Sequence, residues 1–165
     1  MLKVDLNKDQ TKVVTEGENW FFNSSEQIFQ FSGGPGTGKS VTLNALVDRI
    51  NQRKRINVAP MAYTGAAAIV MRMKGMPTAR TCHSWMYKCV EMPVFGYDGE
   101  PLMDKYFNVP ITELRFVPNT EELANIDLIV IDEGSMVPME MRDDILATGK
   151  KIIVTGDIFQ LPPVT

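Results

Sequence analysis

Residues 27–40 read Gln-Ile-Phe-Gln-Phe-Ser-Gly-Gly-Pro-Gly-Thr-Gly-Lys-Ser. The apolar first part of this stretch predicts a short strand at about 28–31. The glycines that follow predict a turn, and the apolar periodicity from Lys39 to about 51 predicts an amphipathic helix. A strand, a glycine-rich turn and a helix in this order are typical of a phosphate-binding unit.

The turn matches the pattern G-x-x-x-x-G-K-[ST], since Gly33 and Gly38 frame four residues and are followed by Lys39 and Ser40. Glycines let backbone N–H groups turn inward around a phosphate, and the helix N-terminus directs its positive dipole end there. Lys39 would supply charge to the β and γ oxygens, and Ser40 a hydroxyl to Mg²⁺. We therefore expect ATP and Mg²⁺ as cofactors. The expected nucleotide-binding residues of the loop are Gly33, Gly34, Pro35, Gly36, Thr37, Gly38, Lys39 and Ser40.

The composition is that of one globular domain of 165 residues, with 44% apolar and 22% charged side chains. The net charge of −3 shows no basic excess, so a nucleic-acid partner would have to meet a local surface. The two cysteines, Cys82 and Cys89, are expected in one helical stretch as ordinary free thiols. No apolar run is long enough to span a membrane and no signal peptide is evident, so we expect a cytoplasmic protein.

Strands and helices are expected to alternate along the chain, which predicts an α/β fold with a parallel sheet flanked by helices. A continuous apolar run at 127–131 is typical of a strand buried on both faces. Further strands are expected at 56–61 and 151–155. Helices are expected from about Asn7 to Glu16, where Gly17 would loosen the first, and at 39–51, 66–75, 81–86 and 138–147.

Residues 92–118 interrupt this alternation, and we expect them to form an insertion with β character. The interval is rich in proline, and Tyr97-Asp98-Gly99-Glu100 is typical of a two-residue hairpin turn. Apolar and charged residues alternate over 112–116, as in a strand with one covered face.

A second half of the nucleotide site is expected at the carboxyl ends of two strands, where open α/β sheets bind ligands. Asp132 and Glu133 follow the buried strand, and the Mg²⁺ of a phosphate loop needs a carboxylate from a neighbouring strand. Asp132 fits that role, and Glu133 would orient or deprotonate the attacking water. Gln160, beyond the last strand, could reach the γ-phosphate or could be a loop amide in solvent.

Three segments together resemble motifs I, II and III of superfamily 1 DNA helicases, closest to the 5′-to-3′ branch that includes RecD and the phage helicase Dda. They are 33–40, Asp132-Glu133-Gly134-Ser135-Met136 and Gly156-Asp157-Ile158-Phe159-Gln160-Leu161-Pro162-Pro163. Residues 6–10 resemble the Q motif of that branch, Tyr63-Thr64-Gly65-Ala66-Ala67 resembles motif Ia, and Thr81-Cys82-His83-Ser84 resembles its Thr-x-His signature. The sequence departs from the family at Ser40, where Thr is usual, at Gly134, and before Tyr63.

The resemblance implies an N-terminal RecA-like motor domain of an ATP-dependent DNA helicase that acts on single-stranded DNA. It implies that Gln10 contacts adenine, that Lys39 contacts the β/γ-phosphates, and that Ser40 and Asp132 hold Mg²⁺. Glu133 would activate water and Gln160 would sense the γ-phosphate. Single-stranded DNA would be contacted by Tyr63, Thr64, Gly65, Thr81 and His83. It also implies that strand 151–155 lies between the phosphate-loop strand and the strand before Asp132, and that 92–118 holds a strand-separating wedge around Phe95–Gly99.

Several alternatives stay open at this point. Gln10 stands where it could close a capping box with Asn7, His83 could cap or pack in a helix turn, and Trp85 is favoured as a core residue over a stacking platform. The chain could also be a P-loop ATPase without helicase activity, of packaging or loader type, or a non-catalytic nucleotide-dependent DNA-binding module.

A second RecA-like domain with an arginine finger is part of a motor of this family, and we find no such sequence in these 165 residues. We therefore expect a further domain or a partner chain to complete the site. By itself the chain is expected to bind ATP and to hydrolyse it slowly.

Overall fold

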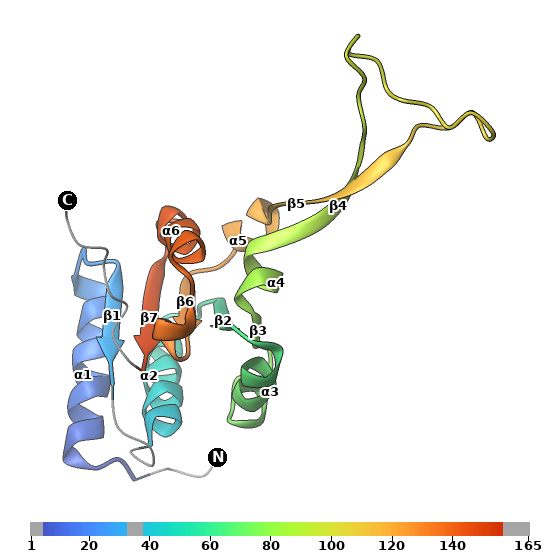
Figure 1. The fold of residues 1–165 in the computed structure, drawn as a ribbon. Coiled ribbons are helices and arrows are strands. Elements are labelled where there is room, and N and C mark those ends of the chain that lie inside the picture. The colour runs from blue at the N-terminus through green and yellow to red at the C-terminus, as the bar shows by residue number, and fades with distance from the viewer. Residues whose placement is uncertain (1–4, 33–37, 157–165) are drawn as a thin grey trace.

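The fold is a five-stranded parallel sheet with helices on both faces, as the alternation of strands and helices predicted (Figure 1). The computed structural model describes residues 5–32 and 38–156. The strands lie in the order β1 (Ile28–Phe31), β7 (Lys151–Thr155), β6 (Leu128–Ile131), β2 (Val58–Ala62) and β3 (Arg80–Thr81). The expected position of strand 151–155, between the phosphate-loop strand and the strand before Asp132, is confirmed.

Alternation of side chains along the central strands divides the core into two layers. Leu128 and Val130 of β6 pack on the face covered by α1 (Lys8–Asn23), α2 (Lys39–Arg53) and α3 (Gly65–Met73). Ile129 and Ile131 pack on the other face, against α4 (Cys82–Met86), α5 (Thr120–Ala124) and α6 (Met139–Ala147). All four of these β6 side chains are fully buried, so β6 is the centre of the hydrophobic core.

Helix α1 is longer than expected, because it continues through Gly17 to Asn23. The expectation that Gly17 loosens the helix is therefore wrong. A Cβ atom at Gly17 would lie 2.6 Å from Leu46 Cδ2 of α2, so glycine at this position lets the two helices approach closely. Inside a helix, glycine is less favourable than alanine by about 1 kcal/mol, and the closer packing of α1 on α2 offsets this cost.

Three short elements were not expected from the sequence: β3, α5 and a 3₁₀ turn at Gly134–Met136. Each is too short to show a periodic pattern of apolar residues. Helix α3 starts one residue before its expected start, since Thr64 Oγ1 accepts the Ala67 N–H at 3.1 Å and caps it.

The insertion forms an antiparallel hairpin of β4 (Tyr87–Pro93) and β5 (Thr112–Pro118), which projects from the body of the domain (Figure 1). We call residues 87–118, the hairpin with its tip, the arm. The β character expected for this interval is found, but the strands begin at Tyr87 instead of about 92. Cys89 consequently lies on β4, and the expectation of one helix holding both cysteines is wrong because α4 ends at Met86. Both thiols are free; Cys82 is buried and Cys89 is exposed.

The tip of the arm, residues 94–111, divides into two loops that meet at three backbone hydrogen bonds. Leu102 N–H donates to Val94 O at 2.8 Å, Ile111 N–H to Leu102 O at 2.8 Å, and Val94 N–H to Ile111 O at 3.0 Å. The first loop contains the expected turn, but three residues form it instead of two. Gly99 alone adopts a left-handed φ of 78° there, whereas a two-residue type I′ turn needs two such residues.

Among the described residues, no helix is both long and apolar enough to cross a membrane.

Candidate functional site

The carboxyl edge of the sheet brings together most of the predicted site residues that the structure describes. Lys39 and Ser40 form the first turn of α2, which follows β1 and the loop, and Asp132 and Glu133 follow β6. Strand β7 lies between β1 and β6 and ends at Thr155 between the two groups. The predicted residues Gly33, Gly34, Pro35, Gly36, Thr37 and Gln160 lie outside the described residues.

Lys39 and Glu133 form a direct ion pair, with Nζ 2.9 Å from Glu133 Oε1. Their side chains come from elements 94 positions apart in the chain, so the pair exists only because β1 and β6 share an edge of the sheet. Both side chains are partly open to solvent, at 24% and 47% relative exposure, so the pair can exchange partners with a ligand.

Asp132 is held by a residue that the sequence did not single out. Thr155 Oγ1 donates a hydrogen bond of 2.7 Å to Asp132 Oδ1, and Thr155 is buried at the end of β7. The available sequence signal was weak: Thr155 is the polar residue that ends an apolar strand just before the Gly156-Asp157 pair.

The backbone around the two acids adopts conformations that few residues tolerate. Glu133 has a φ of 53° and Gly156 a φ of 89°, both in the left-handed region. Left-handed backbone at a residue other than glycine is uncommon and clusters at functional sites. A Cβ atom at Gly156 would lie 2.6 Å from Glu133 Oε2, so a side chain there would displace the Glu133 carboxylate.

The chemistry of these groups fits Mg²⁺ bound to a nucleotide. A recess at this edge is lined by Lys39, Ser40, Asp132 and Thr155, together with residues of α2 and α3. A hydroxyl and a carboxylate are oxygen ligands of the kind Mg²⁺ takes, and the lysine and the N-terminus of the 15-residue helix α2 favour phosphate. Gly38, at the start of that helix, has the left-handed φ of 73°.

Gln10 closes the capping box that the sequence left open as an alternative. Its Oε1 accepts the Asn7 N–H at 3.0 Å, and Asn7 Oδ1 accepts the Gln10 N–H at 2.8 Å. Gln10 also lies against the candidate site, because a Cβ atom at Gly38 would be 2.5 Å from its Nε2. Capping and proximity to the nucleotide site are therefore compatible in this residue.

The residues expected to touch DNA also lie at the carboxyl edge of the sheet, but at strands β2 and β3 instead of β1, β7 and β6. Tyr63, Thr64 and Gly65 follow β2, and Thr81 ends β3, which pairs with β2 in parallel at Ala62. Thr64 and Thr81 cap α3 and α4, since their hydroxyls accept N–H groups of the first helical turn. Tyr63 is 40% exposed at the end of β2, so its side chain is not part of the buried core.

His83 is exposed on α4 and packs among aromatic rings, with its centroid 5.0 Å from Tyr87 and 4.7 Å from Phe116. Trp85 is buried, and its Nε1–H donates to Pro60 O at 2.8 Å. The interpretation of Trp85 as a core residue is thus confirmed.

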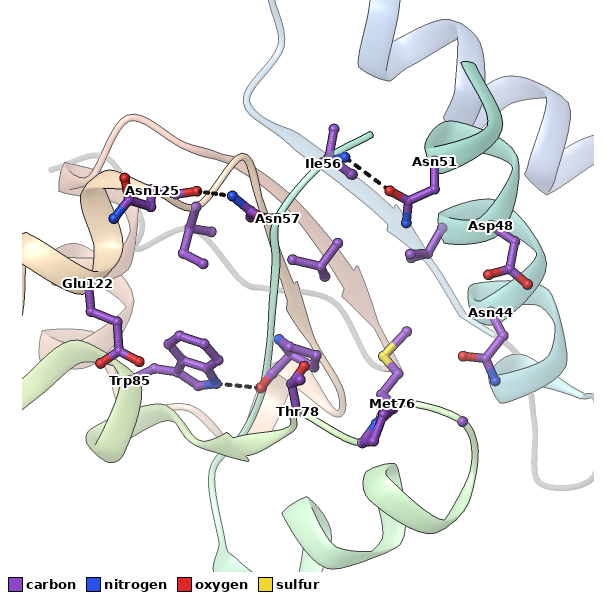
Figure 2. Close-up of a pocket in the computed structure, with 16 residues that line it drawn as sticks. Asn44, Asp48, Asn51, Ile56, Asn57, Met76, Thr78, Trp85, Glu122 and Asn125 are labelled. Carbon is purple, nitrogen blue, oxygen red and sulfur yellow. Dashed lines mark hydrogen bonds between the residues drawn. The ribbon is translucent and has the colours of Figure 1, made fainter. Parts of the chain in front are cut away.

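A larger cleft, of about 570 Å³, lies between α2, β2 and α5 (Figure 2). Asp48 and Glu122 are the charged side chains among the described residues that line it, and both are acidic. Glu122 is paired with Arg80, and no lysine or arginine is among the described residues that line the cleft. The smaller recess at the carboxyl edge contains Lys39 and is therefore the better nucleotide site.

The sheet order, the loop sequence after β1 and the acids after β6 define a P-loop NTPase with a RecA-like fold. A protein family described as an AAA domain matches residues 19–165. The chain belongs to this family.

Named relatives narrow the assignment further. The chain is 31% identical over 144 residues to the ATP-dependent RecD2 DNA helicase of Deinococcus radiodurans, covering 86% of this chain and 17% of that protein. It is 31% identical over 154 residues to the ATP-dependent DNA helicase Pif1 of Campylobacter jejuni, covering 87% of this chain and 32% of that protein. The chain thus spans between about a sixth and a third of the length of these two relatives.

Among solved structures, the Bacteroides Pif1 bound to single-stranded DNA is similar over 99% of this chain and 34% of that one, with a TM-score of 0.55 and 25% identity. A Pif1 structure described as explaining DNA unwinding at forked duplex DNA reaches a TM-score of 0.58 at 25% identity, over 99% of this chain and 36% of that one. These likenesses identify the chain with the N-terminal RecA-like domain of RecD- and Pif1-like superfamily 1 helicases. The motifs predicted the RecD branch, and the comparisons add the likeness to Pif1.

Proposed function

We propose that this chain binds Mg·ATP at the carboxyl edge of its sheet and hydrolyses it as the N-terminal motor domain of a DNA helicase that acts on single-stranded DNA. The convergence of Lys39 and Ser40 with Asp132 and Glu133 carries the proposal. The relatives are named as ATP-dependent DNA helicases, which supports the same activity here.

Each residue has a proposed part in phosphoryl transfer. Ser40 and Asp132 would hold Mg²⁺, which when bound neutralises charge on the β and γ oxygens. Thr155 keeps one carboxylate oxygen of Asp132 occupied and so fixes the orientation of the other. Lys39 would exchange Glu133 for phosphate, and that exchange would leave the Glu133 carboxylate available to accept a proton from water. Gln10 would contact adenine and Gln160 would sense the γ-phosphate.

Single-stranded DNA is the proposed polymer ligand, and Tyr63, Thr64, Gly65, Thr81 and His83 are its proposed contacts. The Bacteroides Pif1 was solved bound to single-stranded DNA, which supports the same ligand for this chain. The first loop of the arm, Phe95–Gly99, is the proposed strand-separating wedge. A second RecA-like domain or a partner chain would close over the nucleotide, and action in the cytoplasm is part of the proposal.

Titration calorimetry with Mg·ADP and Mg·ATP tests the nucleotide site. Lys39→Ala should weaken binding by at least tenfold, because it removes the cation at the phosphate end of the site. Lys12→Ala, an exposed lysine on α1, is the matched control and should bind like the unmodified chain. Equal affinity of the Lys39 variant and the control would refute this site.

A further inference from the structure

Helix α4 carries His83, one of the proposed DNA contacts, and has five residues. A helix of this length is not stable by itself, because its few hydrogen bonds do not offset the entropy that is lost in ordering its backbone. A second proposed contact, Thr81, caps its N-terminus, where Thr81 Oγ1 accepts the Ser84 N–H at 3.1 Å. The positions of both proposed contacts therefore depend on what holds the rest of α4 in place.

The side chain of Arg80 reaches α4 from strand β3, which directly precedes the helix. Its Nε donates a hydrogen bond to Ser84 Oγ at 3.1 Å, and its Nη2 donates to Ser84 O at 2.5 Å. Its guanidinium carbon lies 4.1 Å from the centroid of the Trp85 ring, which is a cation–π contact. Arg80 thus contacts a hydroxyl, a backbone carbonyl and an indole ring of the same short helix.

Two residues at the start of α5 attach the helix from the other side. Glu122 Oε1 accepts a hydrogen bond from Arg80 Nη1 at 2.5 Å. Asn119 Nδ2 donates to Glu122 Oε2 at 2.7 Å and to Trp85 O at 3.1 Å. The backbone N–H of Asn119 donates to Met86 O, the last carbonyl of α4, at 2.9 Å. Helix α5 is therefore linked to α4 through side chains and backbone.

We call Arg80, Asn119 and Glu122 the α4 clamp. Arg80 and Asn119 donate to the last carbonyl groups of α4, which have no acceptor role inside so short a helix. Asn119 is buried, and the hydrogen bonds from Arg80 and Asn119 lower the pKa of the Glu122 carboxyl. Arg80 and Glu122 are 42 positions apart in the chain, so the clamp exists only because α5 returns to lie beside α4.

We propose that Arg80 is a positioning residue for the binding of single-stranded DNA, which acts by holding Thr81 and His83 in place through the α4 clamp. This inference rests on the proposed function, and it adds a residue outside the segments that resemble DNA-binding motifs. Direct contact between Arg80 and a phosphate is less favourable, since Nε, Nη1 and Nη2 already donate to Ser84 and Glu122. A phosphate would have to compete with a carboxylate for the same N–H groups.

Oligonucleotide binding by variants of Arg80 tests the proposal. The probe is a fluorescein-labelled oligothymidine of about twelve nucleotides, and its anisotropy gives the dissociation constant. Arg80→Met should weaken binding about tenfold, because methionine cannot hold α4 or pair with Glu122. Arg80→Lys should weaken binding nearly as much, since lysine keeps the charge but lacks the planar fork of donors. Binding by Arg80→Lys as tight as that of the unmodified chain would show that charge alone is required, and the inference would be wrong.

The matched control is Arg49→Met, which removes an arginine of α2 that is paired with Glu18 of α1. This variant loses the same charge as Arg80→Met, so it measures what net charge alone contributes. It should change the dissociation constant by less than about twofold. A loss as large as that of Arg80→Met would overturn the inference.

A variant of Glu122 gives a test in which the two explanations predict opposite signs. Glu122→Ala removes a negative charge, so electrostatics alone would strengthen the binding of DNA. It also removes the carboxylate that holds Arg80, so the α4 clamp predicts binding weakened by at least about threefold. Glu18→Ala removes a paired glutamate elsewhere on the surface and is the control. Tighter binding of oligothymidine by Glu122→Ala would refute the positioning role.

Two further measurements separate positioning from direct contact and from a general loss of stability. The slope of log K against log salt concentration should be the same for Arg80→Met and the unmodified chain, whereas loss of a phosphate contact would reduce its magnitude by about 0.7. Amide hydrogen exchange should become faster in α4 and stay unchanged in β6, and the affinity for Mg·ADP should not change. A reduced slope, unchanged exchange in α4, or a parallel loss of Mg·ADP binding would each overturn the inference.

Failure of the inference and failure of the proposed function give different results. If the unmodified chain does not bind oligothymidine, the proposed DNA function fails and the inference fails with it. If the unmodified chain binds and the Arg80 and Glu122 variants bind equally well, the proposed function stands and only the positioning role of Arg80 is wrong.

Discussion

At the scale of single residues, the candidate site depends on side chains that reach one another from different strands. Asp132 and Glu133 are adjacent in the chain, yet they have different partners: Thr155 for the first and Lys39 for the second. The backbone at Glu133 is left-handed, with a φ of 53°. Under the proposed function, Asp132 would bind the metal and Glu133 would act on water.

Thr155→Val should weaken the affinity for Mg²⁺ about tenfold or more, because it leaves Asp132 Oδ1 without its hydrogen-bond donor. The measurement is titration of Mg²⁺ into the ADP-bound chain by calorimetry, or of Mn²⁺ by electron paramagnetic resonance. Thr155→Ser keeps the hydroxyl and should restore the affinity. Metal-free ADP should bind both variants alike, and a loss there would point to general damage to the site.

At the scale of elements, tertiary packing determines α1, whereas local strand pairing determines the arm. Glycine usually weakens a helix, but α1 continues through Gly17, where the missing side chain leaves room for Leu46 of α2. In the arm, by contrast, the two strands determine their own shape, because β4 and β5 pair with each other along their whole length. Its exposed apolar side chains do not join the hydrophobic core formed by the described residues.

Gly17→Val should lower the free energy of unfolding by about 2 kcal/mol, because the added methyl groups overpack the contact between α1 and α2. Urea unfolding followed by circular dichroism measures this. Thr15→Val, an exposed position on the same helix, is the control and should change stability by less than about 0.5 kcal/mol. Similar stability of the two variants would mean that the helices separate at little cost.

Tyr97→Ala, at the turn of the first loop, should reduce duplex unwinding by a helicase that carries this domain while sparing its DNA-stimulated ATPase activity. The physical reason is that an exposed aromatic side chain on a narrow loop can separate base pairs of DNA without contacting the ATP site. Strand-displacement and ATPase assays on the same samples measure the two effects. A parallel fall of both activities would assign the loop a structural part instead.

At the scale of the whole molecule, nucleotide and DNA segments share one edge of the sheet. The proposed nucleotide contacts lie at the ends of β1, β7 and β6, and the proposed DNA contacts follow β2 and β3. Strands β6 and β2 are paired in parallel at the boundary between the two groups of residues.

The 165-residue chain should hydrolyse ATP slowly and respond little to DNA. Lysines line the described part of its recess but arginines do not, and a cationic finger can contribute about 10³–10⁵-fold to such reactions. A steady-state ATPase assay with and without oligonucleotide measures this, and Glu133→Gln controls for contaminating activity. Fast, Glu133-dependent and DNA-stimulated turnover would mean that the finger comes from this chain or from a second copy.

The sequence by itself determined the parallel α/β sheet, and its resemblance to a helicase family placed strand 151–155 between two others. The phosphate loop, the buried strand before Asp132 and the three motifs are local patterns, so they can be read from consecutive residues. The capping box of Gln10 is local in the same sense, since it joins residues three positions apart. The core position of Trp85 follows from its residue type, although the group that accepts its Nε1–H, Pro60 O, lies 25 positions away.

The tertiary structure decided the features that depend on residues distant in sequence. Thr155 meets Asp132 because β7 lies beside β6, Gly17 is required because Leu46 faces it, and Phe116 meets His83 because the hairpin returns to its root. No spacing rule predicts such contacts, since each joins side chains whose separation along the chain is set by intervening elements. They arise from how the strands and helices pack, and packing is a property of the whole folded chain.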